Sequence, residues 1–336
     1  MTVRPGTDGS GFRRERNVEV EVLICTHNRA DLLRRTVRSL NEAVRPTGDG
    51  VSLLVAANAC TDGTHEFLAG YEEEGRGKGW LPVRWVEVPT PGKSVALNHA
   101  MPLVRAPAIT FVDDDHRVAP GYLTAVAEAL SAHPEVNLFC GRILPDWDGS
   151  EPAWVHDNGP YKVYPLPVPR FDQGETPKLL EPGTATPGGG NLFFRTELFA
   201  RVGSFPSELG PVGHNLGGAE DIVWVRRALA LGEPLLYFPA ATQYHYVDAT
   251  RLRLGYVIRK AYERTASTMR VAPEVGAADP LPLYMIRKVL GYAAHATFSI
   301  SADRRRYYLV RTAASLGELR GFLHRRSEAR MGIERV

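Results

Sequence analysis

The stretch Ile109-Thr110-Phe111-Val112-Asp113-Asp114-Asp115 carries more information than any other part of this chain. Four residues suited to a buried strand lead directly into three consecutive carboxylates, whose like charges repel one another. A simple turn would use Gly, Asn or Ser at this place. Mg²⁺ or Mn²⁺ would remove the repulsion, because hard cations bind carboxylate oxygens and commonly share them with the phosphates of a substrate. A solvated acidic loop is the alternative that this stretch alone leaves open.

The composition is that of an ordinary soluble globular protein. The chain has 336 residues, of which 44% are hydrophobic and 23% charged, and its formal net charge is +2. The length allows one large domain or two. The net charge argues neither for nor against nucleic acid, and we expect no nucleic-acid partner. Three isolated cysteines, with no Cys-x-x-Cys pair, support neither a disulfide framework nor a zinc site.

The sequence predicts a protein that does not cross a membrane. Residues 1–17 are polar and contain glycine, which predicts a disordered segment without an apolar signal sequence. No window approaches about 18 uninterrupted apolar residues, the length of a membrane-spanning helix. We therefore expect a cytoplasmic protein, with peripheral contact to the inner face of the membrane as an open alternative.

Apolar strands and amphipathic helices alternate over the first half of the chain, which predicts a parallel sheet with helices on both faces. The predicted strands are 18–25, 51–57, 81–88 and 108–112, and the predicted helices are 31–43, 93–104 and 121–133, with a short helix after 60–63. Ligands bind such sheets beyond the carboxyl ends of the strands. Thr26-His27-Asn28, Asn58 and Asp113–Asp115 all follow strand ends, so we expect them to share one site.

The second half of the chain has a less regular pattern. Residues 144–187 are rich in Pro, Gly, Trp and Tyr, which predicts loops over a binding cleft. Beyond them we expect helices over 196–202 and 220–231 and a strand over 235–238. From Arg251 onward the pattern predicts three helices, at 251–271, 281–301 and 304–329.

Three polar clusters in the second half each have a structural and a functional interpretation. The glycines of Gly188-Gly189-Gly190-Asn191 permit either a plain turn or the close approach of a ligand. Glu220 and Asp221 at a helix start are stabilised by the helix dipole, although a carboxylate at such a place can also act as a general base. His245, between two tyrosines, is either a packed histidine or a metal ligand that complements the carboxylates.

Five sequence blocks, in this order, resemble the inverting family-2 glycosyltransferases of the GT-A fold over about residues 18–265. The blocks are VEVLICTHNRADLLRRTVRSL (20–40), LLVAANACTDGT (53–64), PGKSVALNHA (91–100), ITFVDDDHRVAPGYL (109–123), and GGGNLFFRTELFARVGSF (188–205) followed by GGAEDIVWVRRALALGE (217–233). The order of the blocks is highly specific, whereas any one block is not. The resemblance implies an α/β GT-A fold with a mostly parallel sheet flanked by helices, and a C-terminal helical extension.

The resemblance also implies a nucleotide-diphosphate sugar donor that lies across the strand ends. The residues that would lie near its base, ribose or phosphates are Thr26, His27, Asn28, Arg29, Asn58 and Lys93. Asp115 would bind Mg²⁺ or Mn²⁺, and Asp113 and Asp114 would support the ion or the ribose. His245 would be a further metal ligand from the second half of the chain.

On the acceptor side, the resemblance implies that Asp221 is the general base. It would take the proton from the acceptor nucleophile as that nucleophile attacks the anomeric carbon from the opposite face, and one displacement would invert this carbon. Glu220 could orient the base or the acceptor, and it is the second choice for the base itself. The acceptor could be a saccharide, a lipid-linked molecule or a small molecule.

The sequence leaves alternatives open for the nucleotide of the donor and for the functional class of the protein. Many relatives have an acidic residue that contacts the base where this chain has Ala57, so UDP, dTDP and GDP donors stay open. A nucleotidyltransferase is one alternative function, but such enzymes usually have a glycine-rich loop after the first strand, and CTHNRAD (25–31) has no glycine. A non-catalytic nucleotide-sugar-binding relative is another, although the complete set of acidic motifs counts against it.

The sequence thus predicts three segments. Residues 1–17 form a disordered segment, and residues 18–250 form the transferase domain, with a nucleotide-sugar half at 18–135 and an acceptor half at 136–250. Residues 251–336 form a helical extension. Within it, residues 304–326 are basic and amphipathic. Such a helix can lie on an anionic membrane, pack on its own domain or form a homodimer.

Overall fold

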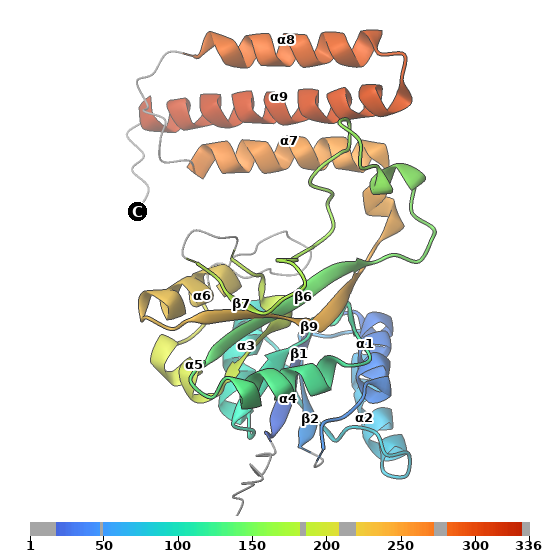
Figure 1. Ribbon diagram of the computed structural model, residues 1–336, viewed down its shortest axis with the longest axis vertical. Helices are drawn as coiled ribbons and strands as arrows, with labels where there is room; N and C mark the ends of the chain where they lie inside the picture. Colours follow the sequence, from blue (N-terminus) through green and yellow to red (C-terminus); the bar gives the residue numbers. More distant parts are fainter. Residues whose placement is uncertain (1–17, 48–49, 182–185, 208–219, 272–280, 331–336) are drawn as a thin grey trace, which may run out of the picture. The chain divides into compact units, whose positions relative to one another are not determined.

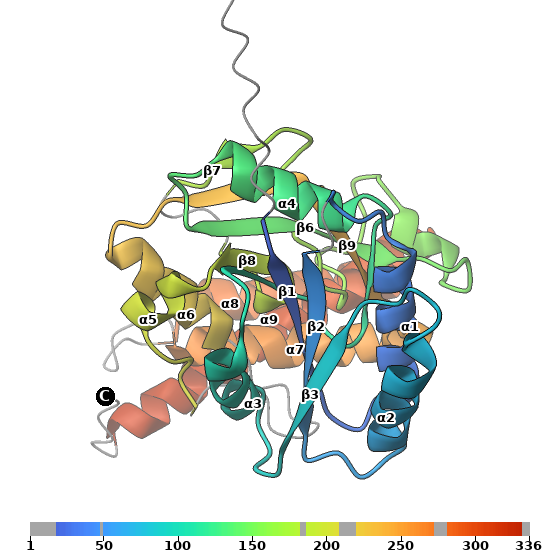
Figure 2. The ribbon, with the colours of Figure 1, turned by 90° about the horizontal axis from the view of Figure 1, so that it is seen from below.

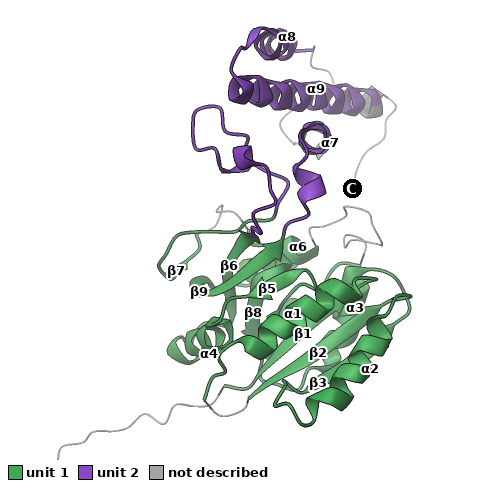
Figure 3. Cartoon of the chain, turned by 90° about the vertical axis from the view of Figure 1, so that its right-hand side faces the viewer, with its two compact units in different colours: residues 1–145, 169–246 green, residues 146–168, 247–336 purple. Residues whose placement is uncertain are grey.

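A computed structural model gives the structure of the protein and describes residues 18–47, 50–181, 186–207, 220–271 and 281–330 (Figure 1). The predicted disordered segment 1–17 lies outside the described residues. The chain forms two compact units (Figure 3). Unit 1 comprises residues 1–145 and 169–246, and unit 2 comprises residues 146–168 and 247–336. The segment predicted as loops, 144–187, is therefore divided between the two units.

Unit 1 is built on one mixed sheet. Its strands are β1 (Val20–Thr26), β2 (Val51–Asn58), β3 (Val83–Val88), β4 (Ala108–Phe111), β5 (His116–Val118), β6 (Leu138–Asp146), β7 (Lys178–Leu179), β8 (Leu192–Arg195) and β9 (Leu235–Tyr246). They follow the order β3-β2-β1-β4-β8-β6-β9-β5, with β7 paired to β9 (Figure 2). The pairings among β1 to β4 are parallel, as predicted. The β4–β8, β6–β8, β5–β9 and β7–β9 pairings are antiparallel.

Helices cover both faces of this sheet, as predicted. They are α1 (Ala30–Glu42), α2 (Thr64–Gly75), α3 (Lys93–Ala100), α4 (Tyr122–Ala132), α5 (Glu197–Val202) and α6 (Glu220–Ala230). Because side chains alternate along a strand, Val22 and Ile24 of β1 enter the core beneath α1, α2 and α4, whereas Leu23 enters the core beneath α3, α5 and α6. The central strand is therefore apolar on both faces, as buried parallel strands are.

The sheet places the predicted site residues at one edge. β1 ends at Thr26, β2 ends at Asn58, and β4 leads directly into Asp113–Asp115. Because these strands are parallel neighbours, their carboxyl ends lie at the same edge, where α/β proteins bind ligands.

An unpredicted strand, β5, and the unpredicted part of β9 complete this edge. β5 has only three residues, and β9 extends eight residues beyond the predicted end at Phe238. The antiparallel β5–β9 register pairs His116 directly with His245. Directly opposite side chains in an antiparallel pair lie about 5 Å apart at Cβ. The backbone ladder therefore brings together two histidines that are distant in the sequence.

Unit 2 contains the three predicted C-terminal helices, α7 (Leu254–Val271), α8 (Leu283–Phe298) and α9 (Ala302–Arg330). α9 lies between α7 and α8 (Figure 1). Gly317 and Gly321 of α9 lie against the backbone carbonyls of Tyr262 and Ala266 in α7. No helix among the described residues combines the length and the apolar character needed to cross a bilayer.

Side chains of the basic segment 304–326 pack against other parts of unit 2. Arg306 pairs with Asp157 at 3.1 Å and lies 5.0 Å above the ring of Trp154. Phe322 is buried. The sequence left open whether this segment packs on its own domain or elsewhere, and the structure places it in intramolecular packing.

The close contact of α7 and α9 gives a stability prediction. A Cβ at Gly317 would lie 2.1 Å from the Tyr262 carbonyl oxygen, so Gly317→Ala forces the two helices apart. We expect a loss of about 1–3 kcal/mol in the free energy of unfolding. A Cβ at Gly291 of α8 would meet nothing within 4 Å. Gly291→Ala is the matched control and should stabilise the helix by about 0.8 kcal/mol.

Urea unfolding followed by circular dichroism measures both effects. Equal stability of the two alanine variants would contradict the packing of α9 against α7.

Candidate active site

A pocket of about 200 Å³ opens at the carboxyl ends of the parallel strands and gathers most of the predicted site residues. It is lined by Cys25, Thr26, His27, Arg29, Asn58, Lys93, Asp113, Asp114, Asp115 and His245. A larger groove of about 710 Å³ runs along α1 and α2, but none of the predicted site residues lines it. The smaller pocket is therefore the candidate active site, because the three adjacent carboxylates, the cationic side chains and His245 predicted for the site line it.

The three consecutive carboxylates have different partners. Asp113 accepts a hydrogen bond from Lys93 Nζ at 2.8 Å. Asp114 accepts from Thr26 Oγ1 at 2.8 Å and from Arg29 Nη1 at 3.0 Å. Asp115 accepts from the same Arg29 nitrogen at 3.0 Å. Two cationic side chains therefore offset much of the repulsion that the sequence predicts.

The environments of Asp113 and Asp114 separate their pKa values. Burial opposes the ionisation of Asp113, but Lys93 and then His116 hold its pKa well below the usual range. For Asp114, burial and the charge of Asp115 raise the pKa to about 6, although Arg29 opposes the shift. Burial also opposes the charge on Lys93, but Asp113 raises the pKa of the lysine above its usual value. Lys93 and Asp113 therefore form a charged pair inside the pocket.

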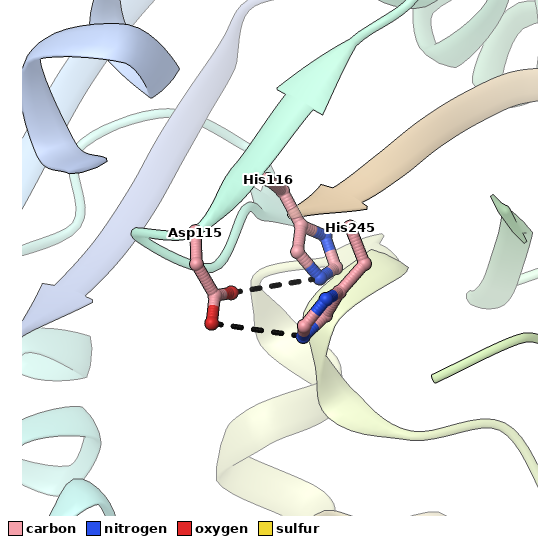
Figure 4. Close-up of side chains that lie close together, drawn as sticks. All are labelled: Asp115, His116 and His245. Carbon is pink, nitrogen blue, oxygen red and sulfur yellow. Dashed lines mark ion pairs between the residues drawn. The ribbon is translucent and has the colours of Figure 1, made fainter. Parts of the chain in front are cut away.

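Asp115 faces two histidines. His245 Nε2 lies 3.6 Å from its Oδ2, and His116 Nε2 lies 3.9 Å from its Oδ1 (Figure 4). One ligand atom of each of the three residues lies within 4.8 Å of the others. His116 was not among the predicted site residues. It directly follows the third aspartate in the sequence, and this DDDH run is the signal that could have identified it.

Hydrogen bonds on the far side of each ring fix which nitrogen carries the proton. His245 Nδ1 lies 2.6 Å from the carbonyl oxygen of Tyr246, which can only accept, so Nδ1 donates. Gln243 Nε2 donates to the carbonyl of Phe111 at 2.9 Å, which leaves its Oε1 facing His116 Nδ1. His116 Nδ1 therefore donates as well. In the neutral rings, both Nε2 atoms present lone pairs toward Asp115.

This arrangement fits a divalent cation. Burial lowers the pKa of His245 below its usual value although Asp115 opposes the shift, which favours the neutral ring. Two lone pairs and a carboxylate that face one another repel, and a cation between them converts all three into ligands. The acceptors behind both rings supply the outer hydrogen bonds that metal-binding histidines usually make.

The buried Gln243 belongs to a wider polar network. Its Nε2 also contacts the hydroxyl of Tyr122 at 2.7 Å and Oδ1 of Asn191 at 3.0 Å. Asn191 Nδ2 donates to the carbonyls of Arg142 and Ala241, both at 2.9 Å, which fixes the orientation of its amide. Asn191, the last residue of the Gly-Gly-Gly-Asn block, thus supports His116 through Gln243.

Asn58 and Asn28, both predicted to lie near the donor, use their side-chain amides for hydrogen bonds within the chain. Asn58 donates to the carbonyls of Val88 and Thr90 and accepts from the amide of Gly92 at 2.8 Å. Asn28, at a φ of 52°, accepts from the amide of Thr61 at 2.7 Å. Asn58 lines the pocket and Asn28 does not, so the structure gives both residues a role in holding the loops around it.

Cys25 lines the pocket without being a candidate nucleophile. Burial raises the pKa of its thiol to about 12, which keeps the sulfur protonated. Only the thiolate is strongly nucleophilic, so Cys25 is not suited to form a covalent intermediate.

The predicted base lies beside the pocket. Asp221, in the first turn of α6, lines a small neighbouring cavity together with Lys93, Asp113 and Gly189. Lys93 and Asp113 also line the main pocket, so the two cavities are adjacent. Asp221 Oδ1 accepts from the amide of Ile222 at 2.7 Å, and Oδ2 accepts from the amide of Gly189. These bonds fix the position of the carboxylate.

Glu220 differs from its neighbour. Only 2% of the residue is exposed, and among the described residues its Oε2 has no hydrogen-bond partner. Burial raises the pKa of Glu220, Lys93 opposes this shift, and Asp221 adds to it. Of the two predicted acids, Asp221 is therefore the one with both carboxylate oxygens hydrogen-bonded.

Comparison with known proteins identifies the family. Residues 21–203, more than half of the chain, match the model of glycosyl transferase family 2. The chain belongs to this family. No curated protein is similar enough in sequence to count as a relative.

Solved structures share the fold of this transferase. Residues 1–349 of S. aureus TarS align at 16% identity and a TM-score of 0.53, over 94% of this chain and 92% of that one. The mannosyltransferase PcManGT from Pyrobaculum calidifontis, in complex with GDP-Man and Mn²⁺, aligns at 18% identity and a TM-score of 0.52, over 89% and 86%. The chain spans 47% of a longer TarS structure. The fold is therefore GT-A, with a mixed sheet, flanking helices and a helical C-terminal region.

The glycine block gives a prediction about the site of the transferase. A Cβ at Gly190 would lie 2.6 Å from Asp113 Oδ2 and 2.8 Å from His116 Cε1. Gly190→Ala therefore displaces one of these side chains, and we expect a loss of about 100-fold in sugar transfer, the usual effect of a misplaced active-site group.

Gly188→Ala is the matched control. Its Cβ would lie 3.6 Å from Asp221 Oδ2, an ordinary contact, and the φ of −73° at Gly188 suits alanine. Transfer rates and thermal midpoints of both variants should be measured together. If Gly190→Ala kept full activity, the close approach of this loop to the site would be wrong.

Proposed function

We propose that this transferase is a metal-dependent, inverting enzyme that moves a sugar from a nucleotide-diphosphate donor to an acceptor in a single displacement. The observation that carries the proposal is the cluster of three ligand atoms, from Asp115, His116 and His245, that lie within 4.8 Å of one another at the main pocket. Asp221 lies beside this pocket, since it lines a small adjacent cavity together with Lys93 and Asp113, which line the main pocket as well.

Asp115, His116 and His245 would hold the metal, which would neutralise the negative charge that develops on the departing diphosphate. Two imidazole nitrogens favour Mn²⁺ over Mg²⁺, because Mg²⁺ prefers oxygen ligands in a strict octahedron. The Mn²⁺ in the PcManGT complex supports this choice.

The remaining residues of the pocket would position the donor. Lys93 and Arg29 carry positive charge next to the carboxylates and would contact phosphate oxygens. Thr26, His27 and Asn58 line the pocket where a ribose or base would lie. TarS was solved with UDP-GlcNAc and PcManGT with GDP-Man, which supports a nucleotide-sugar donor of the UDP, dTDP or GDP type.

Asp221 would act as the general base. Its two backbone hydrogen bonds fix the position of the carboxylate beside Lys93 and Asp113. It would take the proton of the acceptor nucleophile while that nucleophile attacks the anomeric carbon, and the carbon would invert because only one displacement occurs. The acceptor would be a saccharide, a lipid-linked molecule or a small molecule.

His116 gives a direct test of the metal site. His116→Ala should weaken Mn²⁺ binding by at least about tenfold, because it removes one of three protein ligands. His133→Ala is the control, since His133 lies at the end of α4 next to Glu135. Titration followed by electron paramagnetic resonance measures free Mn²⁺ without any need for activity. Equal affinity of the wild type and His116→Ala would remove His116 from the ligand set.

Variants of Asp221 and of Asp115 should differ in whether they impair the transfer step or the binding of the donor. Asp221→Asn should lower the transfer rate by about 10²–10⁴-fold and leave donor affinity within about twofold, because a general base acts on the acceptor. Asp115→Ala should instead weaken Mn²⁺-dependent donor binding. Thermal shift with sugar nucleotides and Mn²⁺ first identifies the donor, since a ligand of the folded state raises the melting temperature.

Glu220→Gln is the companion variant in the same helical turn. Full turnover by Asp221→Asn together with loss of turnover by Glu220→Gln would mean that Glu220 is the general base and that Asp221 is not.

A further inference from the structure

The outer face of α8 exposes an unusual amount of apolar surface. Of the side chains of α8, only Met285 and Ala296 are buried. Leu283, Leu290 and Phe298 expose 75%, 64% and 81% of their surface. Since α8 packs beside α9, a single neighbouring helix covers only one side of it (Figure 1).

The exposed residues form one continuous stripe. Leu283, Arg287, Leu290, Ala294 and Phe298 are all exposed and follow one another at intervals of three or four residues, which places them on one face of a helix. We call these five residues the α8 stripe. At its C-terminal end the chain turns toward α9, and Ile300 in that turn is fully exposed.

The charge within the α8 stripe has one sign. No Asp or Glu occurs between Leu281 and Ala302, and Arg287 lies within the stripe. In the first turn of α9, Arg305 is exposed, and the exposed Asp303 pairs with Arg306 at 3.1 Å. Lys288 pairs with Glu318 of α9 at 2.6 Å, so it belongs to the internal packing of unit 2 and not to the stripe. The α8 stripe itself is thus apolar and basic and carries no acidic side chain.

We propose that the α8 stripe binds an anionic lipid bilayer. Apolar side chains of an interfacial helix enter the boundary between headgroups and acyl chains, while basic side chains contact the anionic headgroups. Phe298 and Ile300 lie at the turn and enter this boundary first. Arg287 and Arg305 contact lipid phosphates, which accept hydrogen bonds from guanidinium groups.

A second copy of the chain suits this surface less well. In a symmetric pairing of two α8 helices, Arg287 would be covered by a stretch that contains no carboxylate. A guanidinium that is buried without a partner is unfavourable. Anionic lipids supply the missing negative charge.

The proposed lipid-binding surface lies mainly on α8 and not on the basic segment 304–326, which the sequence suggests for membrane contact. The basic segment 304–326 is held between α7 and α8, as the contacts of Gly317, Gly321 and Lys288 show. Leu316 and Leu323 of this segment expose 42% and 47% of their surface, less than Leu283, Leu290 and Phe298 of its neighbour α8. The proposal goes beyond the sugar-transfer reaction and does not depend on it.

Sedimentation of the full chain with vesicles tests the proposal. The wild type should sediment with vesicles of phosphatidylglycerol and phosphatidylcholine and bind vesicles of phosphatidylcholine alone more weakly. The double variant Leu290→Ser/Phe298→Ser should bind the anionic vesicles at least about tenfold more weakly, because it removes two large apolar side chains. Arg287→Gln should weaken binding to the anionic vesicles and leave binding to the neutral ones unchanged.

The matched control replaces two exposed leucines of unit 1. Leu179 and Leu231 expose 54% and 60% of their surface, and Leu179→Ser/Leu231→Ser should bind vesicles like the wild type. Circular dichroism and thermal midpoints establish that each variant folds, which is expected at exposed positions.

Three results would overturn the proposal. They are absence of binding by the wild type, equal binding by the wild type and Leu290→Ser/Phe298→Ser, and equal loss in the unit 1 control. Light scattering measures the oligomeric state and so tests the other possible occupant, a second copy of the chain. A wild-type dimer that becomes a monomer in Leu290→Ser/Phe298→Ser, with no binding to vesicles, would assign the α8 stripe to a second copy of the chain.

Discussion

Three adjacent carboxylates at the end of a buried strand can coexist only if nearby positive charge offsets their repulsion. Lys93 supplies it to Asp113, and Arg29 supplies it to Asp114 and Asp115. The rest of the site is arranged around this requirement. α3 begins at Lys93, α1 follows Arg29, and β5 and β9 turn two imidazoles toward the third carboxylate. Two cationic side chains at the starts of α1 and α3 therefore offset the repulsion that arises at the end of β4.

Much of this arrangement follows from the sequence, because local patterns determine it. The parallel order of β1 to β4 rests on alternating apolar strands and amphipathic helices, and the position of the site rests on where those strands end. The acidic cluster, Lys93 and Asp221 lie in blocks that resemble the family, and the resemblance predicts roles for them and for His245, which lies beyond the last block.

The parts that could not be predicted depend on contacts between distant residues. β5 is too short for any periodicity to be visible, and its partner β9 lies more than a hundred residues later. The role of His116 depends on a hydrogen bond to Gln243, and the role of Asn58 depends on backbone groups of the next strand. The exposure of α8 likewise depends on which helix lies beside it. An amphipathic pattern shows that a face is apolar but does not show whether another helix covers it.

The direct pairing of His116 with His245 has one further consequence. The backbone ladder and the bonds at Nδ1 hold both rings in place, so folding alone has already ordered the ligands. Binding of the proposed ion would therefore cost little side-chain entropy. The fold would not depend on this ion, unlike that of a zinc finger, which folds only with its metal.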